Sequence, residues 1–446
     1  MDKANIQKVV RATNGPKHHL FGFHDLIATN ISGDKLLSLE VETFNRPPLP
    51  EENAGVGYVD IFTHNFIELC KTNAFNYPQG ARQQWIDDTH FIVNNQVGGH
   101  WGADIYDVEQ RRNVRSLDAP CHCLSPDKKC AYSINYSRLH RLGGYGYIGV
   151  PDKTAEEETP DDDGIFITDI ETNQTRLLVS IAEVAACQPE SSLHNGNHHY
   201  LTHLVVSPNG KRIAFLHRCF FADGGIRTRI MTIGVDGEGL RCLAYGFLSH
   251  FDWKDDEHIF IWGRPSSSID TMRSTPIFSN PMLSPIFSIA KTIAKKLLKK
   301  KVSSNMSFLM LSDTNPSQIK PFAQGVLTCD GHPMTCPTDN DLCICDTYPD
   351  KNMERTLFTY RFSTNERIDL GRFRMINEQP DGSLFNQYTE GVDAGIIKMF
   401  SPDLYSFTRS GLHCDLHPRW SADGKYAIFD SIHEGSRQIY MCQIVK

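Results

Sequence analysis

The sequence predicts an all-β protein that folds as one seven-bladed β-propeller, with a basic amphipathic helix inserted in the fifth blade. Two observations predict this fold. A phrase made of a polar turn and an apolar strand recurs seven times along the chain, and a hairpin of alternating apolar residues follows each phrase. Short antiparallel strands in radially repeated units of about four are typical of propeller blades.

The repeated phrases divide the chain evenly from end to end. They begin at Asn30 (NISGDKLLSLE), Trp85 (WIDDTHFIVNN), Leu124 (LSPDKKCAYSI), Val206 (VSPNGKRIAFLH), Trp253 (WKDDEHIFIWG), Cys336 (CPTDNDLCICDTY) and Trp420 (WSADGKYAIFDS). The predicted blades span roughly 18–70, 79–117, 119–180, 200–244, 247–323, 329–371 and 412–446, with a further strand expected near Ile6 to Ala12. Two β-sandwiches would give a similar pattern of strands, but the even spacing leaves no linker. We therefore predict a single domain over 1–446.

Residues 264–306 interrupt the fifth predicted blade. Apolar residues recur there at helical spacing on one face, with lysines on the other: Ile286, Ile289, Ile293 and Leu297 against Lys291, Lys295 and Lys299. A basic amphipathic helix can lie in a membrane interface with its lysines on anionic headgroups. We expect 278–301 to bind an anionic membrane surface; docking on the propeller itself or on a protein partner is the alternative.

Composition and charge narrow the class of protein. A chain of 446 residues with 40% hydrophobic and 22% charged residues can bury a sizeable core. Its formal charge of −8 argues against a globally basic nucleic-acid binder, and no nucleic-acid partner is expected. The N-terminus lacks the pattern of a secretory signal, and the 13 cysteines follow no secreted disulfide framework. We expect a cytoplasmic protein with peripheral contact to the inner face of the cell membrane.

Histidines precede six of the seven phrases, on the strand expected to line the centre of the propeller. They are His24, His122, His203, His250, His332 and His417, while the second blade offers Gln79 and Arg82 instead. Imidazole binds transition metals and transfers protons near neutral pH, so a shared polar site is predicted. His250, His332 and His417, with Cys414 as a fourth ligand, could form a divalent-metal site. Zinc is the first expectation, with manganese or calcium as alternatives, and Cys414 could instead be a buried filler.

The most specific phrases carry a family resemblance. HHLFGFHD from His18, YLTHLVVSPNGKRIAFLHR ending at Arg218, DGHPMTCPTDNDLCICDTYPD and CDLHPRWSADGKYAIFDSIHEGSRQIY resemble the seven-bladed propeller polysaccharide lyases. The resemblance is to the ulvan-lyase type and, more distantly, to oligogalacturonate lyase. It implies β-elimination at a uronic acid residue of an anionic glycan or oligosaccharide. It also implies that His250, His332 and His417 hold a metal that is structural or helps to bind the uronate.

Elimination at a uronate needs a base, an acid and a group that neutralises the carboxylate. Arg218 can clamp a carboxylate in bidentate fashion, and His122, His203 and Tyr200 could share the acid and base roles. The resemblance implies that His203 and Arg218 lie on the active-site strand. We expect Arg82, Tyr145 and His24 to bind substrate.

The missing export signal favours a role inside the cell, in bacterial capsule or exopolysaccharide metabolism. Two other functions fit the same residues. A glycosyltransferase or glycoside hydrolase could act in glycan assembly at the membrane surface, because a ring of histidines with an arginine would serve those reactions as well. A noncatalytic glycan-binding propeller scaffold is the third hypothesis.

Overall fold

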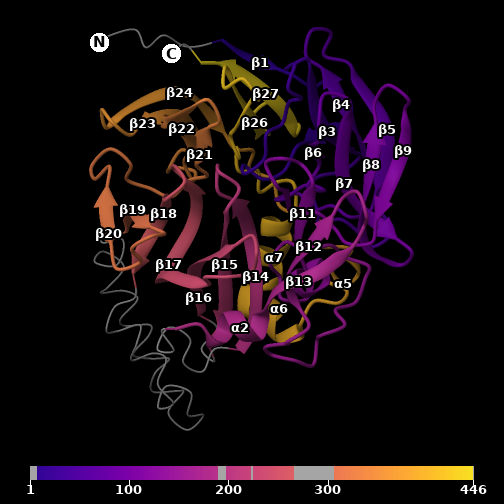
Figure 1. Ribbon diagram of the computed structural model, residues 1–446. Helices are drawn as coiled ribbons and strands as arrows, with labels where there is room; N and C mark the ends of the chain where they lie inside the picture. The colour runs from indigo at the N-terminus through magenta and orange to yellow at the C-terminus, as the bar shows by residue number, and fades with distance from the viewer. Residues whose placement is uncertain (1–7, 189–196, 222–224, 266–305, 445–446) are drawn as a thin grey trace. The chain divides into compact units, whose positions relative to one another are not determined.

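The computed structural model describes residues 8–188, 197–221, 225–265 and 306–444. Antiparallel strands dominate these residues (Figure 1). The chain divides into two compact units, one of residues 1–153, 166–176 and 331–446 and the other of residues 154–165 and 177–330. None of the helices in the described ranges has the length and apolar character that a membrane span requires.

Five of the sheets in the described residues have four strands each. In four of them the strands follow the chain: β2 (His18–Leu20), β3 (Lys35–Val41), β4 (Ala54–Asp60) and β5 (Phe66–Thr72) form the first, and β6 (Gln84–Trp85), β7 (His90–Val97), β8 (His100–Asp107) and β9 (Arg112–Leu117) form the second. The third consists of β10 (Cys123–Leu124), β11 (Cys130–Ile134), β12 (Gly164–Asp169) and β13 (Thr175–Ser180), and the fourth of β21 (Met334–Cys336), β22 (Asp339–Asp346), β23 (Glu354–Arg361) and β24 (Glu366–Arg374). The fifth joins the two ends of the chain in the order β1 (Val9–Arg11), β27 (Gln438–Gln443), β26 (Tyr426–Ser431) and β25 (Arg419–Trp420). Each of these sheets contains one of the predicted phrases.

The second unit contains a seven-stranded sheet. Its strands follow the chain in order: β14 (Asn197–Val206), β15 (Arg212–Phe220), β16 (Ile226–Gly234), β17 (Arg241–Trp253), β18 (His258–Pro265), β19 (Ser307–Ser312) and β20 (Ile319–Phe322). The sequence predicts a blade boundary between residues 244 and 247, but β17 runs through it without a turn. A bulge between Leu248 and Phe251 takes up the change of register instead.

The repeated phrase folds in the same way in different sheets, because its serine fixes the turn. The serine hydroxyl accepts a hydrogen bond from the backbone N–H five residues later at 3.0 Å, in the pairs Ser125 with Cys130, Ser207 with Arg212 and Ser421 with Tyr426. The same hydroxyl donates to a side chain two residues on, at Asp127, Asn209 and Asp423. The SPDG-like turns are therefore built by the residues that mark them in the sequence.

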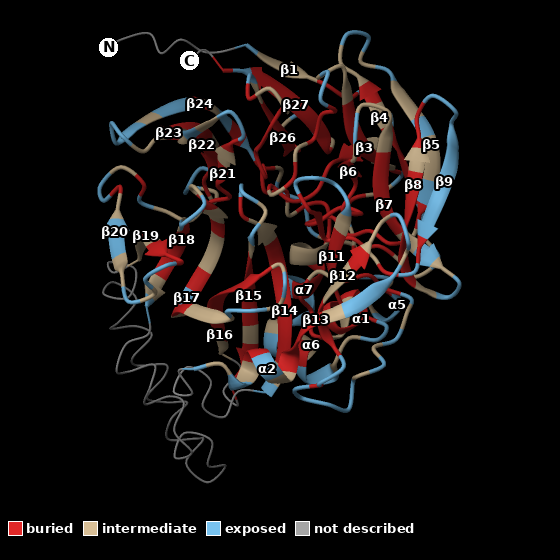
Figure 2. Cartoon of the chain, in the orientation of Figure 1, coloured by how far each residue is buried: buried red, intermediate tan, exposed pale blue. Residues whose placement is uncertain are grey.

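Tryptophans in three of the phrases each bond to the segment just before the preceding phrase. The indole N–H of Trp85 donates to the Ala28 carbonyl at 3.2 Å, that of Trp253 to Val205 at 3.0 Å and that of Trp420 to Met334 at 2.9 Å. The outermost strands of the sheets are the most exposed, and β9 shows this along most of its length (Figure 2). Burial therefore falls from the inner to the outer strand, as in propeller blades.

Near the N-terminus, β1 pairs with β27, so that Val9 lies opposite Cys442 (Figure 1). The Thr13 hydroxyl donates to the Gln438 side chain at 2.6 Å and accepts from the Ile439 N–H at 2.9 Å. The extra strand that the sequence predicts near the N-terminus is thus part of the last sheet. The number of blades and the closure of a ring remain predictions.

Short helices follow or interrupt the sheets in both units. They are α1 (Tyr136–Arg141), α5 (Phe385–Tyr388), α6 (Ala394–Phe400) and α7 (Pro402–Arg409) in the first unit, and α2 (Ile181–Ala186) in the second. Asn135 caps α1 and Asp393 caps α6 through their side-chain oxygens. No element is predicted from the sequence for the segment that holds α5 to α7. Most of the predicted amphipathic insertion, including 278–301, lies outside the described residues.

Candidate functional site

Three of the predicted histidines meet inside the first unit. His24 follows β2, His332 precedes β21 and His417 precedes β25, so each comes from the inner end of a different sheet. The ring centroids of His332 and His417 lie 4.4 Å apart, and His24 lies 5.5 Å from His332 and 6.1 Å from His417. All three are almost completely buried. The structure therefore brings these segments together into one polar cluster.

Asp415 completes a set of side chains that fits a metal ion. Its Oδ2 lies 3.8 Å from Nε2 of His332 and 3.8 Å from Nε2 of His417. Ligand atoms of these three residues lie within 4.8 Å of one another. Two ligand atoms that each lie about 2.1 Å from a metal are about 3.4 Å apart at a tetrahedral angle, so this spacing suits a bound ion.

The hydrogen bonds of both imidazoles set the tautomer that metal binding requires. Nδ1 of His332 donates to Asp346 at 2.8 Å, and Nδ1 of His417 donates to the Gly22 carbonyl at 3.0 Å. Because a carboxylate and a carbonyl can only accept, each ring carries a proton on Nδ1, and Nε2, which faces Asp415, is the nitrogen that can bind a metal when the ring is neutral. Metal-binding histidines are oriented in this manner in many proteins.

The charges around the cluster favour the same protonation states. Burial alone would raise the pKa of Asp415, but Arg355, whose Nη2 lies 2.6 Å from its Oδ1, holds that pKa well below its ordinary value. Burial, reinforced by His332, keeps the pKa of His417 well below its ordinary value. The cluster thus offers an ionised carboxylate and a neutral imidazole.

Two of the predicted metal ligands lie outside this set. The Cys414 side chain is buried, and burial raises the pKa of its thiol to about 12, which disfavours the thiolate. His250 belongs to the second unit, where its Nδ1 lies 3.2 Å from Asp330 Oδ1. Metal binding by Cys414 and His250 remains a prediction.

Arg82 and His122 lie in a second buried network of the first unit. Both Nη atoms of Arg82 bind the Asp25 carboxylate at 2.8 Å, and its Nε donates to the His122 carbonyl at 2.8 Å. Nδ1 of His122 is bonded to the Tyr136 hydroxyl at 2.9 Å, while its Nε2 is buried without a hydrogen-bond partner among the described residues. Burial, then the charge of Arg82, holds the pKa of His122 well below its ordinary value.

In the second unit, β14 and β15 carry the residues predicted for catalysis. Tyr200 lies directly opposite Arg218, so their side chains share one face of the sheet. His203 follows on β14 at a bulge between Thr202 and Val205, which breaks the alternation of the strand. No carboxylate of the described residues forms an ion pair with Arg218, and its Nε is buried without a hydrogen-bond partner there.

Backbone strain marks several of the predicted site residues. Arg82, Tyr145, His203 and His417 have φ angles of 54°, 74°, 59° and 42°. This left-handed region costs residues other than glycine about 1–3 kcal/mol and is retained where the surroundings enforce it, often at functional sites. The sequence patterns alone gave no sign of this strain.

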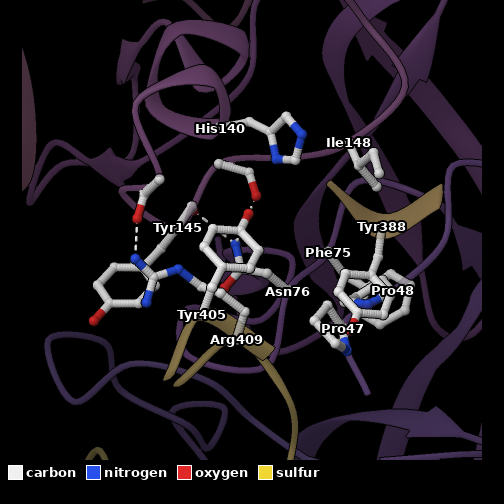
Figure 3. Close-up of a pocket in the computed structure, with 12 residues that line it drawn as sticks. Pro47, Pro48, Phe75, Asn76, His140, Tyr145, Ile148, Tyr388, Tyr405 and Arg409 are labelled. Atoms are coloured by element: carbon white, nitrogen blue, oxygen red, sulfur yellow. Dashed lines mark hydrogen bonds between the residues drawn. The ribbon is translucent and has the colours of Figure 1, made fainter. Parts of the chain in front are cut away.

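A pocket opens in the first unit beside the loop that contains Tyr145 (Figure 3). It is small, and its lining consists of Pro47, Pro48, Phe75, Asn76, His140, Gly143, Tyr145, Gly146, Ile148, Tyr388, Tyr405 and Arg409. Of these residues, Tyr145 is predicted from the sequence to bind substrate. The others come from α1, α5, α7 and connecting loops, for which no repeat or motif gave a signal.

Comparisons with known proteins support the fold. No family model and no curated protein matches the chain. An oligogalacturonate lyase from Vibrio parahaemolyticus is 13% identical, with a TM-score of 0.58 over 100% of this chain and 96% of that chain. An oligogalacturonate lyase in complex with manganese is 12% identical, with a TM-score of 0.40 over 99% and 94%. The tricorn protease is 11% identical, with a TM-score of 0.48 over 97% of this chain and 34% of that chain.

At these identities the likeness shows the fold alone. The first of these structures supports an all-β, propeller-like architecture over the whole chain. The comparisons give no support to the ulvan-lyase part of the resemblance. The identity of a metal, the membrane surface and the place in the cell likewise remain predictions from the sequence.

Proposed function

We propose that this protein is a polysaccharide lyase-like enzyme that cleaves a uronic-acid-containing glycan by β-elimination. The observation that carries the proposal is the cross-strand pair of Tyr200 and Arg218, with His203 on the same strand as Tyr200. A phenol, an imidazole and a guanidinium that lacks a carboxylate partner among the described residues are the groups that this reaction needs. They lie together on two neighbouring strands of one unit.

Arg218 would bind the carboxylate of the uronate at the cleavage site. Its fork of N–H donors matches the two carboxylate oxygens, and binding neutralises the charge that grows on the carboxylate as the adjacent C5 loses its proton. The guanidinium of Arg82, by contrast, is already engaged by Asp25. Arg218 is therefore the better clamp for a substrate carboxylate.

His203 and Tyr200 would move the protons. Imidazole, with an ordinary pKa of about 6.5, can accept the C5 proton near neutral pH, and a phenol, with an ordinary pKa of about 10, can donate one. The electron pair of the C5–H bond forms the C4=C5 double bond, and the C4–O bond breaks. The leaving oxygen keeps the electron pair of that bond and takes the proton of Tyr200.

His332, Asp415 and His417 would hold a divalent cation, with zinc as the first candidate and manganese or calcium as alternatives. Two imidazoles and one ionised carboxylate form a donor set that suits such a cation. When bound, the cation would supply positive charge for structure or for binding a uronate. The proposed glycan belongs to bacterial capsule or exopolysaccharide metabolism, and the proposed place of action is the inner face of the cell membrane.

The test is an elimination assay on a panel of uronic-acid polysaccharides and oligosaccharides. The product carries a double bond conjugated to its carboxylate, and its ultraviolet absorbance reports the reaction. We expect the wild-type protein to produce this absorbance, and Arg218→Ala to reduce the rate at least about a hundredfold, as loss of one preorganised charge stabiliser does elsewhere. Arg112→Ala, an exposed arginine on β9, is the matched control.

Two results would contradict the proposal. One is a folded wild-type protein, supplied with zinc and with manganese in turn, that gives no absorbance on any uronate. The other is an Arg218→Ala variant as active as Arg112→Ala. Either result is decisive once an unfolding transition verifies that the protein in question is folded.

A further inference from the structure

An arginine lies against the cluster of His332, Asp415 and His417, and the proposed reaction gives it no role. Arg355 belongs to β23 and is almost completely buried, as are the three members of the cluster. Its Nη2 lies 2.6 Å from Oδ1 of Asp415, and the exposed fractions of the two side chains are 1% and 8%. A buried guanidinium this close to a candidate metal ligand affects how that ligand can bind a cation.

The two carboxylate oxygens of Asp415 have different surroundings. Oδ2 faces the imidazoles, at 3.8 Å from Nε2 of His332, 3.8 Å from Nε2 of His417 and 3.6 Å from Nδ1 of His413. Each of these separations is longer than a hydrogen bond. Oδ1 is the oxygen that faces Arg355. The carboxylate therefore has one oxygen directed to the imidazoles and one directed to a guanidinium.

Arg355 is held in this position by its other contacts. Nη1 donates to the Thr347 carbonyl at 3.4 Å, and Nε donates to the Met375 sulfur at 3.3 Å. The guanidinium carbon lies 5.4 Å from the centre of the Tyr348 ring, within the range of a cation–π contact. The positive charge is therefore fixed in place beside Oδ1 of Asp415.

A second carboxylate fixes the frame in which the cluster lies. Asp346 accepts hydrogen bonds from the backbone N–H and Nδ1 of His332, both at 2.8 Å, and from the backbone N–H of Leu416 at 3.1 Å. Leu416 follows Asp415 in the chain, so this carboxylate ties the segment before β21 to the segment before β25. The positions of the ligands are thus set by the fold itself.

This arrangement leaves Asp415 one oxygen for a cation. A carboxylate that binds calcium through both oxygens must bring each of them to about 2.3–2.6 Å from the same ion. A cation that contacts Oδ1 as well as Oδ2 would lie close to the guanidinium of Arg355, and in a buried site the repulsion between two positive charges is strong. The position of least repulsion is on the Oδ2 side, between the imidazoles.

We propose that Arg355 makes this cluster selective for a transition-metal cation over calcium, because it restricts Asp415 to a single ligand oxygen. Three protein ligands and a water suffice for a tetrahedral zinc site, and imidazole suits transition metals. Calcium takes about six to eight oxygen ligands, and carboxylates that bind through both oxygens help to supply them. Arg355 is thus a positioning residue. The inference rests on the proposed function for the presence of a divalent cation, and it removes calcium from the three candidates.

The first test compares manganese and calcium as probes, with the wild-type protein stripped of metal by a chelator and binding followed by calorimetry. We expect manganese to bind at least about tenfold more tightly than calcium. Asp415→Asn should weaken manganese binding at least about tenfold, which assigns the ion to this cluster. Equal affinity of the wild-type protein for the two cations would overturn the inference without any need for an arginine variant.

The second test changes the arginine. Arg355→Met removes the charge and the donors but keeps an unbranched side chain, so both oxygens of Asp415 become available. We expect the ratio of calcium affinity to manganese affinity to rise at least about tenfold in this variant. A change in charge alone alters the affinity for both dications by a similar factor, so the ratio reports the ligand oxygens. An unchanged ratio would overturn the inference and leave Asp415 as a metal ligand.

Two further variants make the second test decisive. Arg355→Lys keeps a positive charge and N–H donors beside Oδ1, and its ratio should stay near the wild-type value. Arg372→Met, which changes an exposed arginine on the neighbouring strand β24, is the matched control and should bind both cations as the wild type does. A ratio that rises as much in Arg355→Lys as in Arg355→Met would overturn the inference. Melting temperatures establish that each variant is folded, and the wild-type comparison decides the matter if Arg355→Met is not.

Failure of the inference and failure of the proposed function give different results. Manganese binding that survives unchanged in Asp415→Asn would place the ion elsewhere and overturn the inference, whatever the elimination assay gives. Elimination that depends on Arg218, with a cation ratio that does not depend on Arg355, would overturn the inference and leave the reaction in place. A ratio that depends on Arg355, without elimination of any uronate, would support the inference and contradict the proposed reaction.

Discussion

At the scale of single residues, burial decides the charge of the histidines. Burial, opposed in part by the hydrogen bond to Glu390, lowers the pKa of His140 to about 4. The unfolded chain takes up this proton near the ordinary pKa of about 6.5, and the folded protein takes it up only near pH 4. Between these values the unfolded state binds more protons, so stability is lost as the pH falls through this window.

His140 therefore predicts a specific pH dependence. Its pKa difference corresponds to a loss of up to about 3 kcal/mol in the free energy of unfolding from about pH 7 to about pH 4. Urea unfolding across this range measures the loss. His140→Gln should show a correspondingly smaller fall, and identical pH profiles for the two proteins would contradict the assignment of a neutral buried imidazole.

Asp430 is a single buried carboxylate that pairs with two buried arginines. It pairs with Arg419 at 2.9 Å and with Arg437 at 3.1 Å, and all three side chains are buried. Asp430→Asn leaves two buried guanidinium groups without their counter-ion, so we expect a loss of about 3–5 kcal/mol in unfolding free energy. Asp423→Asn, which removes an exposed ion pair with Lys425, should cost less than about 1 kcal/mol. Similar losses in the two variants would contradict this account.

Individual ligands were harder to predict than the histidine pattern. His24, His332 and His417 could be aligned because each precedes a phrase, and the structure brings them together. Asp415 lies two residues before His417 and shares its cluster, but no repeat marks it. Arg409, which lines the pocket beside Tyr145, also lies outside every repeated unit. Residues in insertions carry no periodic signal, so long-range packing alone determines where they lie.

At the scale of elements, the turn residues gave the clearest prediction of where the strands lie. The Ser and Asp residues of the repeated phrases fix the turn through local hydrogen bonds, which is why the sequence predicts these strands well. The blade boundary expected between residues 244 and 247 stays a prediction, because β17 continues through it and its bulge lies between Leu248 and Phe251. The helices α5 to α7 are short and lack a repeat, so the sequence pattern did not indicate them.

The pairing of β1 with β27 predicts a stability contribution from the first strand. Without residues 8–11, β27 loses the partner of its residues Tyr440 to Cys442 and becomes a sheet edge. We expect a truncation that begins at Ala12 to lower the melting temperature by several degrees relative to one that begins at Lys8. Differential scanning calorimetry measures this, and equal melting temperatures would show that β1 contributes nothing.

At the scale of the whole molecule, the cluster of His332, Asp415 and His417 predicts that a divalent cation stabilises the folded protein. A cation that binds the folded protein stabilises it by about 2.7 kcal/mol at a hundredfold excess over its dissociation constant. Zinc or manganese should therefore raise the melting temperature of the wild-type protein, and Asp415→Asn should abolish that rise. His90→Gln, outside the cluster, is the control. A metal response that survives in Asp415→Asn would place the ion elsewhere.

The all-β, propeller-like fold follows from features distributed over the entire sequence. Repeated turns, alternating strands and the tryptophans that tie successive sheets all recur, so errors at one position do not change the prediction. A reaction depends on a few atoms instead. The repeats could predict that polar residues line the inner strands, but not the tautomers or the carboxylate partners that determine their chemistry.

The most direct test of the central claim is the mass balance of cleavage. A uronate oligosaccharide incubated with the protein should give two fragments whose masses add up to that of the substrate, one of them unsaturated. This result would establish β-elimination. Fragments whose masses together exceed that of the substrate by one water would show hydrolysis and contradict the account, as would a folded protein that leaves every uronate oligosaccharide intact.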